Sequence, residues 1–266
     1  MKIKSVLTLI AAALFIGGAA SVARAGASPA DLSAGEICKQ ATAKYASLTS
    51  YSDDGTTVST IGAITAMNYT FTINLARTNL YQIVWRQADE FYIPKGVVWS
   101  AGNGNFIWMG KNFTPRKCQD QEMAIASATG ISGGAAAEVP GAFFKSKWGN
   151  QLDSPKSDFK RKPDEKLGDV DCYVLTHGTG GRTNTLWIGK TDWLIHQIEH
   201  DTSAALMKTM MEEQAKKMPQ IRAMLEASGG EMFKDSRSVE THQNIRLNPP
   251  LTPSDFDFKA PVDAKP

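Results

Sequence analysis

Residues 69–75 read Tyr-Thr-Phe-Thr-Ile-Asn-Leu, and this strict alternation of apolar and polar side chains decides the fold of the chain. Successive side chains of a β-strand point to opposite faces of the sheet. The four apolar residues therefore share one face, and the three polar residues share the other. Such a strand is typical of an antiparallel sheet that is packed on one side and wet on the other.

The same period of two recurs along the chain. Segments rich in Thr, Val, Ile and aromatic residues are separated by Gly, Asn or Asp, which predicts further strands. These strands are expected at 56–61, 68–75, 81–86, 172–177, 183–188, 193–201 and 238–247. Residues 97–109 predict a hairpin whose turn uses the left-handed backbone of Gly102 and Gly104.

Apolar residues at helical spacing predict helices elsewhere. The segment 31–48 predicts the first helix, which residues 28–29 (Ser-Pro) would start. Residues 119–129 predict a second helix, and 135–144 predicts a short third helix that is broken near Pro140. With few β-α-β signals, these elements predict an α+β fold in which a strongly curved antiparallel sheet of about ten strands wraps the helices.

The segment 203–227 is rich in methionine, and its apolar residues fall at helical spacing. Pro219 predicts a kink or the start of a second helix. Methionine fills irregular gaps and adapts to varied ligands, so this segment is a candidate lid over an apolar cavity. A helix fixed in the core is the alternative, and a Cu(I) site fits the spacing less well.

The first 25 residues have the pattern of a cleavable signal peptide. Lys2 and Lys4 precede an apolar run at 6–20, and Ala23-Arg24-Ala25 follows as a small-x-small cleavage site. The run is about 15 residues long, whereas a bilayer-spanning helix needs about 20. We predict cleavage before Gly26, a periplasmic location, no membrane-spanning segment, and a single domain at 26–266 with a helical insertion at about 203–227.

Charge and cysteine usage argue against several kinds of site. Residues 1–25 hold three of the 29 basic residues and none of the 27 acidic ones, which leaves the mature chain a net charge of −1. We therefore expect no nucleic-acid partner. Cys38, Cys118 and Cys172 form no C-x-x-C motif, so a zinc-ribbon or thioredoxin-type site is not expected. One pair could form a disulfide in an oxidising compartment, and all three pairings stay open.

Two short motifs resemble those of enzymes. Residues 196–200 spell H-x-x-E-H, which binds zinc only on a helix, whereas the flanking sequence predicts a strand. Residues 130–134 spell G-x-S-x-G, the nucleophile elbow of hydrolases, but a helix-forming segment precedes it in place of a buried strand. We expect a glycine-rich helix stop there, and we expect no metal, no cofactor and no catalytic residue. A serine esterase that uses Ser132 remains an alternative.

The order of these elements resembles the LolA/LolB-like family of lipoprotein carriers. The stretch 77–85 is similar to the family's Arg-Pro-Asn-Leu-aromatic strand, with Thr78 in place of the proline. The hairpin at 98–108 is similar to the family's VSDGKTLWVY hairpin, 186–199 to a second Trp-containing hairpin, and 256–261 to a Phe-x-Phe-x-x-Pro ending. The helix at 203–227 makes the chain most similar to a DUF2092-type branch.

The resemblance implies an unclosed half-barrel whose concave apolar face is covered by helices. It also implies a periplasmic carrier or sensor that holds a lipid, an acyl chain or a lipoprotein in outer-membrane biogenesis. The family's lid-latching arginine falls on Arg77, which can donate to carbonyls at a helix end. We expect the ligand to contact Tyr69, Phe71, Ile73, Trp85, Trp108, Met207, Met210 and Met211. A sensor or scaffold that binds envelope proteins is the other alternative.

Overall fold

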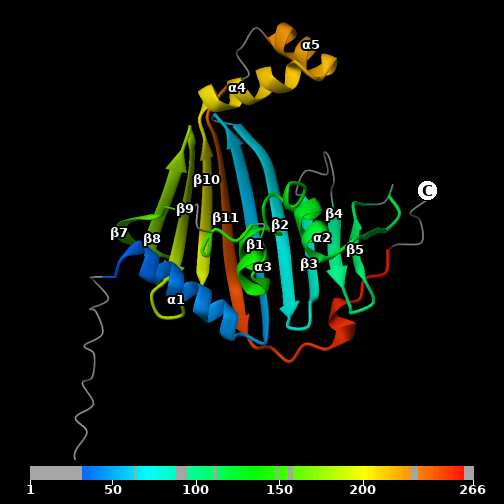
Figure 1. Ribbon diagram of the computed structural model, residues 1–266, viewed down its shortest axis with the longest axis vertical. Helices are drawn as coiled ribbons and strands as arrows, with labels where there is room; N and C mark the ends of the chain where they lie inside the picture. The colour runs from blue at the N-terminus through cyan, green and yellow to red at the C-terminus, as the bar shows by residue number, and fades with distance from the viewer. Residues whose placement is uncertain are drawn as a thin grey trace, which may run out of the picture. The chain divides into compact units, whose positions relative to one another are not determined.

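Eleven strands form one antiparallel sheet in the part of the chain that the structure describes. The structure is a computed structural model that describes residues 32–62, 64–87, 95–110, 113–147, 149–154, 158–228 and 233–260. The strand order is β6-β5-β4-β3-β2-β1-β11-β10-β9-β8-β7, and the sheet is not closed (Figure 1). The strands are β1 Ser50–Ile61, β2 Ile64–Ala76, β3 Leu80–Gln87, β4 Lys95–Ser100, β5 Asn105–Trp108, β6 Arg116–Cys118, β7 Lys160–Leu167, β8 Val170–Thr179, β9 Arg182–Gly189, β10 Ile195–Thr202 and β11 Ser236–Leu247.

This architecture confirms the predicted α+β fold with an unclosed antiparallel sheet, and every predicted strand is present. Two strands were not predicted, and both lie at the edges of the sheet. β6 has only three residues, and β7 reads Lys-Arg-Lys-Pro-Asp-Glu-Lys-Leu. Short edge strands, and edge strands with charges and proline, resist pairing with another chain. The same features hide them from a search for alternating apolar residues.

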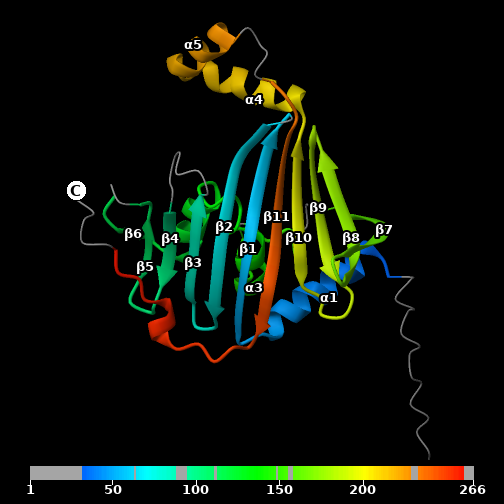
Figure 2. The same ribbon diagram turned by 180° about the vertical axis from the view of Figure 1, so that it is seen from behind.

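Helices cover one face of this sheet, as Figures 1 and 2 show from opposite sides. The chain runs outward from β1 to β6, passes over the sheet through α2 (Gln121–Thr129) and α3 (Glu138–Phe144), and returns from β7 to β11. The first helix, α1, spans Ala34–Ser47. We call the face that carries these three helices the concave face.

The helix ends correct two predictions. α1 begins at Ala34 because Ser33 and Glu36 form a capping box, while residues 28–29 lie outside the described residues, as does the predicted signal peptide. Pro140 does not break α3: it lies in the first turn, where an amide has no intrahelical acceptor and a proline costs no hydrogen bond.

The methionine-rich segment forms two helices, α4 (Ala204–Ala215) and α5 (Pro219–Ser228), so Pro219 starts a second helix. α4 follows β10 directly, and Figure 1 shows the pair beyond the ends of the strands. None of the side chains of α4 is buried, so this helix is not part of the core of the sheet. None of the helices in the described ranges is long and apolar enough to cross a bilayer.

Both faces of the sheet contribute to the core, but with different partners. On the concave face Tyr69, Phe71, Ile73 and Leu75 of β2 are all buried, which confirms the alternation predicted for this strand. The opposite face of β3–β5 has its own cluster, in which the C-terminal Phe258 packs on a set that comprises Val97, Trp99 and Trp108.

The space around two glycines differs between the concave face and helix α1. A Cβ at Gly96 would lie 1.9 Å from Cζ2 of Trp85, whereas a Cβ at Gly35 in α1 would meet nothing within 4 Å. Gly96→Ala should therefore displace the indole and lower the free energy of unfolding by roughly 1–3 kcal/mol. Gly35→Ala should raise it by about 0.5 kcal/mol, because alanine loses less backbone entropy in a helix. Urea unfolding measures both, and equal effects at the two positions would contradict this packing.

Candidate functional site

Apolar side chains from neighbouring strands line the centre of the concave face. Phe71 of β2 lies opposite Trp85 of β3, and Ile73 lies opposite Ile83. At most 3% of the surface of each of these four side chains is exposed. This wall is large enough to bind a hydrocarbon chain, but α1, α2 and α3 cover it in the structure.

Arg77 ties two of these helices to the sheet. It follows β2 in a turn where Thr78 and Asn79 both have positive φ, 70° and 64°. Its guanidinium donates from Nε to the carbonyl of Leu48 (2.8 Å), from Nη2 to that of Tyr45 (2.7 Å) and from Nη1 to that of Phe143 (2.6 Å). We call these three hydrogen bonds the Arg77 clasp.

The clasp uses carbonyls at the C-terminal ends of two helices. Tyr45 and Leu48 lie at the C-terminal end of α1, and Phe143 lies in the last turn of α3. Such carbonyls carry partial negative charge and are suited to a cationic donor. The guanidinium carbon also lies 4.1 Å from the centre of the Phe143 ring. Arg77 thus donates to carbonyls at helix ends, but the helices are α1 and α3 and not the methionine-rich pair, and its role as a latch stays a prediction.

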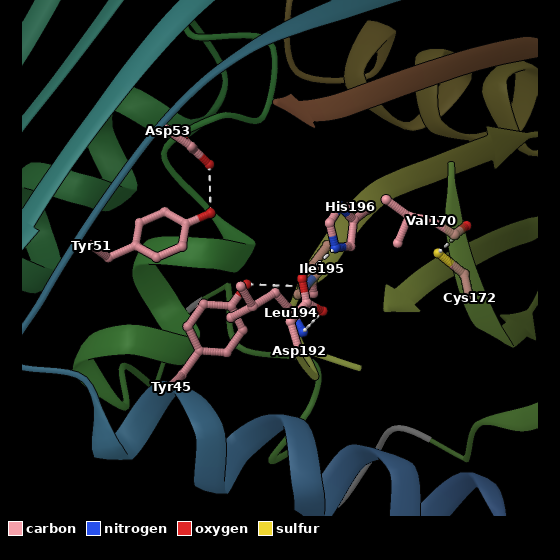
Figure 3. A network of polar contacts seen from close by, with 9 residues as sticks. All are labelled: Tyr45, Tyr51, Asp53, Val170, Cys172, Asp192, Leu194, Ile195 and His196. Carbon is pink, nitrogen blue, oxygen red and sulfur yellow. Dashed lines mark hydrogen bonds and ion pairs between the residues drawn. The ribbon is translucent and has the colours of Figure 1, made fainter. Parts of the chain in front are cut away.

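Tyr45 adds a second link between α1 and the sheet. Its hydroxyl oxygen accepts a hydrogen bond from the backbone N–H of Ile195, 3.2 Å away, at the start of β10 (Figure 3). Its ring packs 5.9 Å from that of Tyr51 on β1. Both tyrosines are completely buried, and this burial raises the pKa of each phenol. Neutral tyrosines therefore hold α1 in place at physiological pH.

Charged side chains interrupt the apolar wall where β1 meets β11. The Tyr51 hydroxyl donates to Oδ2 of Asp53 at 2.7 Å, and Nδ1 of His242 lies 2.6 Å from the same oxygen. Nε2 of His242 lies 3.0 Å from Oε1 of Glu240, an ion-pair contact without the angle of a hydrogen bond. Together with Glu138 of α3 we call these residues the buried polar cluster; the exposed fraction of none of them exceeds 3%.

The environment of the buried polar cluster shifts two of its pKa values. Burial opposes the protonation of His242, but the charges of Asp53 and Glu240 and the hydrogen bond to Asp53 outweigh it and raise the pKa of the imidazole to about 10. Burial raises the pKa of Glu138 to about 8, although the amide of Gln151 donates to its Oε1 at 2.7 Å. At neutral pH the cluster therefore holds a protonated histidine and a neutral Glu138.

A cavity of about 700 Å³ opens beside α1 and approaches this cluster. Cys38 and Thr42 of α1 line one side, and Leu152 and Phe159 line the other. Burial raises the pKa of the Cys38 thiol to about 11, and the nearby carboxyl of Glu138 adds to this shift. The cavity therefore lies between α1 and the segments 152–154 and 158–159.

The structure brings together only part of the predicted ligand-binding set. Tyr69, Phe71, Ile73 and Trp85 lie side by side on the concave face. Trp108 is on the opposite face, where its ring lies 5.3 Å from that of Phe258. Three more predicted residues are half-buried on α4, outside the sheet: Met207, Met210 and Met211.

The side chains of the two enzyme-like motifs form hydrogen bonds within the protein. Ser132 is completely buried, and its hydroxyl donates to the carbonyl of Thr129 (3.1 Å) and accepts from the amide of Ala136 (3.2 Å). The H-x-x-E-H residues lie on β10: His196 binds Asp192 (2.9 Å), and His200 binds Asn184 (2.7 Å).

Across the described ranges, no cluster of three or more His, Cys, Asp or Glu side chains could hold a metal ion. The three cysteines are free and buried in this structure, so none of the three conceivable disulfides is formed.

The sequence analysis missed the buried polar cluster. Residues 51 and 53, like 240 and 242, are two apart on strands and therefore share a face. The sequence therefore predicts that each pair shares a face. It does not predict that this face is buried, because Val239 and Thr241 on the other face of β11 are the more apolar pair.

Known proteins resemble the chain in structure but not in sequence. No family model and no curated protein matches it. One matching structure is a LolA superfamily protein from Nitrosomonas europaea, 11% identical, with a TM-score of 0.36 over 85% of this chain and 98% of that one. Another is a DUF1329 family protein from Desulfovibrio piger, 9% identical, with a TM-score of 0.39 over 84% and 95% of the two chains.

A third matching structure is the MucA/MucB complex of Pseudomonas aeruginosa, 9% identical, with a TM-score of 0.40 over 86% of this chain and 62% of that one. The DUF2092-type label stays a prediction.

Glu138 should make stability fall as pH rises. Its pKa is about 8 in the folded chain against 4.5 for a free side chain, so the folded state keeps a proton that the unfolded state releases between these values. Glu138→Gln removes this ionisation. Relative to the native chain, the variant should gain roughly 1–3 kcal/mol of unfolding free energy between pH 5 and pH 8.5.

Urea unfolding at a series of pH values measures this gain. Glu213→Gln on the exposed side of α4 is the matched control, and it should show no such change. A constant difference between the Glu138 variant and the native chain at all pH values would contradict a raised pKa.

Proposed function

We propose that this chain is an exported, periplasmic binding protein that holds an acyl chain of a lipid or lipoprotein against the concave face. The observation that carries the proposal is the Arg77 clasp, which ties the ends of α1 and α3 over a continuous apolar wall. Breaking these polar contacts would remove one of the links that hold both helices, without disturbing any strand. The ligand would then take the place of the helices on the wall.

Burial of an acyl chain on the wall would offset part of the free energy lost when the helices leave it. α1 buries only Ile37, Cys38, Ala41 and Tyr45, so it gives up a modest apolar area when it leaves the sheet. Burying one methylene contributes about 0.8 kcal/mol, so a C14 chain would gain about 11 kcal/mol before the costs of ordering it. A ligand of this size can therefore compete with the covering helices.

Within this proposal Tyr69, Phe71, Ile73 and Trp85 form the wall that the chain touches. Met207, Met210 and Met211 would act at the end of the sheet, as a movable lid or as a contact for the part of the ligand that extends beyond it. Met210 lies near the start of β9, where its sulfur accepts a hydrogen bond from Nη2 of Arg182 at 3.6 Å.

A movable lid at 203–227 should exchange its amide hydrogens faster than residues 68–75, and this exchange should become slower when ligand binds.

No contact in the described residues favours the esterase alternative, because the Ser132 hydroxyl is bound to backbone groups. Loss of ester hydrolysis in Ser132→Ala would nonetheless revive it. A protein-binding scaffold would leave acyl probes unbound.

Opening at the clasp predicts the effect of Arg77→Ala. A fluorescent C14 alcohol should bind this variant several-fold faster than the native chain, because fewer contacts hold α1 and α3. The variant should also lose roughly 2–3 kcal/mol of unfolding free energy with its three charge-assisted hydrogen bonds. Stopped-flow fluorescence measures the rate, and circular dichroism checks that the variant folds.

Arg86→Ala, on the exposed side of β3, is the matched control and should leave the rate unchanged. If Arg77→Ala is folded and binds at the native rate, the clasp does not control access to the concave face.

A further inference from the structure

The buried polar cluster has acceptors that no protein group satisfies. Among the described residues, Oδ1 of Asp53, Oε1 of Glu240 and Oγ1 of the neighbouring Thr57 have no hydrogen-bond partner, although this Glu240 oxygen keeps its ion-pair contact with His242. Asp53 and Thr57 are completely buried, and Glu240 is 2% exposed. A buried acceptor without a donor costs free energy, so a donor that reached these oxygens would stabilise the site.

These oxygens come from one face of two paired strands. Thr57 of β1 lies directly opposite Glu240 of β11, and His242, which binds Asp53, lies opposite Gly55. The three oxygens therefore flank one patch of the concave face. The ring of Phe71 covers Gly55 in this patch, so the apolar wall begins where the polar groups end.

The charge of the patch is not balanced by the sheet alone. Asp53 and Glu240 contribute two negative charges and His242 contributes one positive charge, because the two carboxylates keep the imidazole protonated. The sheet side thus carries a net charge of about −1, and a buried net charge is costly unless it is paired. The complementary group is a cation that also donates hydrogen bonds.

A removable cover lies on this patch. The glycine turn before α3 lies against it, since a Cβ at Gly134 would be 2.9 Å from Oε2 of Glu240 and one at Gly133 would be 3.2 Å from Cγ2 of Thr57. Both glycines have positive φ, which other residues rarely adopt. Glu138 follows at the start of α3, the helix that the Arg77 clasp holds. Opening α3 would therefore uncover the acceptors together with the wall.

We propose that Glu240 and Thr57, beside the Asp53–His242 pair, bind the primary ammonium head group of a long-chain amphiphile, whose hydrocarbon chain lies on the wall formed by Phe71, Ile73 and Trp85. This inference rests on the proposed function, because the acceptors are reached only when the helices open. It specifies the chemical class of the ligand, which is a lipid that carries an amine. The acceptors bind the N–H donors of that amine.

Four C14 probes test the head group, each measured at pH 7 by displacement of the fluorescent C14 alcohol. Tetradecylamine should bind at least ten-fold more tightly than tetradecanol. Tetradecyltrimethylammonium, which has the charge but no N–H donor, should bind several-fold more weakly than the amine. Tetradecanoate should bind more weakly than the alcohol, because it brings a second negative charge to the patch.

Glu240→Gln should lower the preference for the amine over the alcohol about ten-fold. Glu199→Gln is the matched control, because Glu199 is also largely buried but binds Arg237 on the other face of the sheet. Thr57→Val keeps the shape of the side chain and removes one acceptor, so it replaces Glu240→Gln if that variant does not fold. It should weaken amine binding a few-fold.

The outcomes separate the two proposals. If the alcohol binds but the amine binds no more tightly, the ammonium site is wrong and the proposed acyl-binding function stands. If the amine is preferred but Glu240→Gln and Thr57→Val do not alter that preference, the assignment to these acceptors is wrong. If none of the probes binds, the proposed function fails, and this inference fails with it.

Discussion

A sheet that does not close on itself must have its apolar face covered by something else. The eleven strands bury Phe71, Ile73, Ile83 and Trp85 on one face, and the edges at β6 and β7 do not meet. Because apolar surface is costly in water, the helices that cross this face are part of the same folding unit as the strands. How those helices are held decides whether the face is a permanent core or a binding site.

The contacts that hold the helices on the sheet differ in kind from those that join the strands. Arg77 reaches three carbonyls at the ends of α1 and α3, and Tyr45 accepts one backbone amide from β10. These are directional contacts at helix ends, which a small rotation can break together. The strands below are joined by long ladders, such as those of β1 with β2 and β11, so they resist the same displacement.

Much of this arrangement could be predicted from sequence, for reasons that particular residues make plain. The alternation at 69–75 placed four side chains on the correct face, because one face of β2 is buried and the other is partly wet. Alternation failed for Trp108, since both faces of β4 and β5 are buried and the period of two no longer marks the inside. β7 was missed because an edge strand excludes partners with Pro163 and lysines.

The buried polar cluster could not be assigned from sequence because charged residues on a strand usually face water. Only the pairing of β1 with β11, close to 190 residues apart in sequence, brings Asp53 to His242. The role of Arg77 was easier to predict, because an arginine at a strand end needs acceptors and helix C-termini supply them. Which helices supply them depended on the tertiary fold.

The most direct test asks where a bound chain lies. Methyl-labelled protein, mixed with tetradecylamine, would be measured by NMR for intermolecular nuclear Overhauser effects from the methylenes of the ligand. The account predicts contacts to the methyl groups of Ile73 and Ile83 on the concave face, and none to Val84 and Val97 on the opposite face. Contacts to Val84 and Val97, or binding without any contact to Ile73 and Ile83, would contradict a ligand site on the concave face.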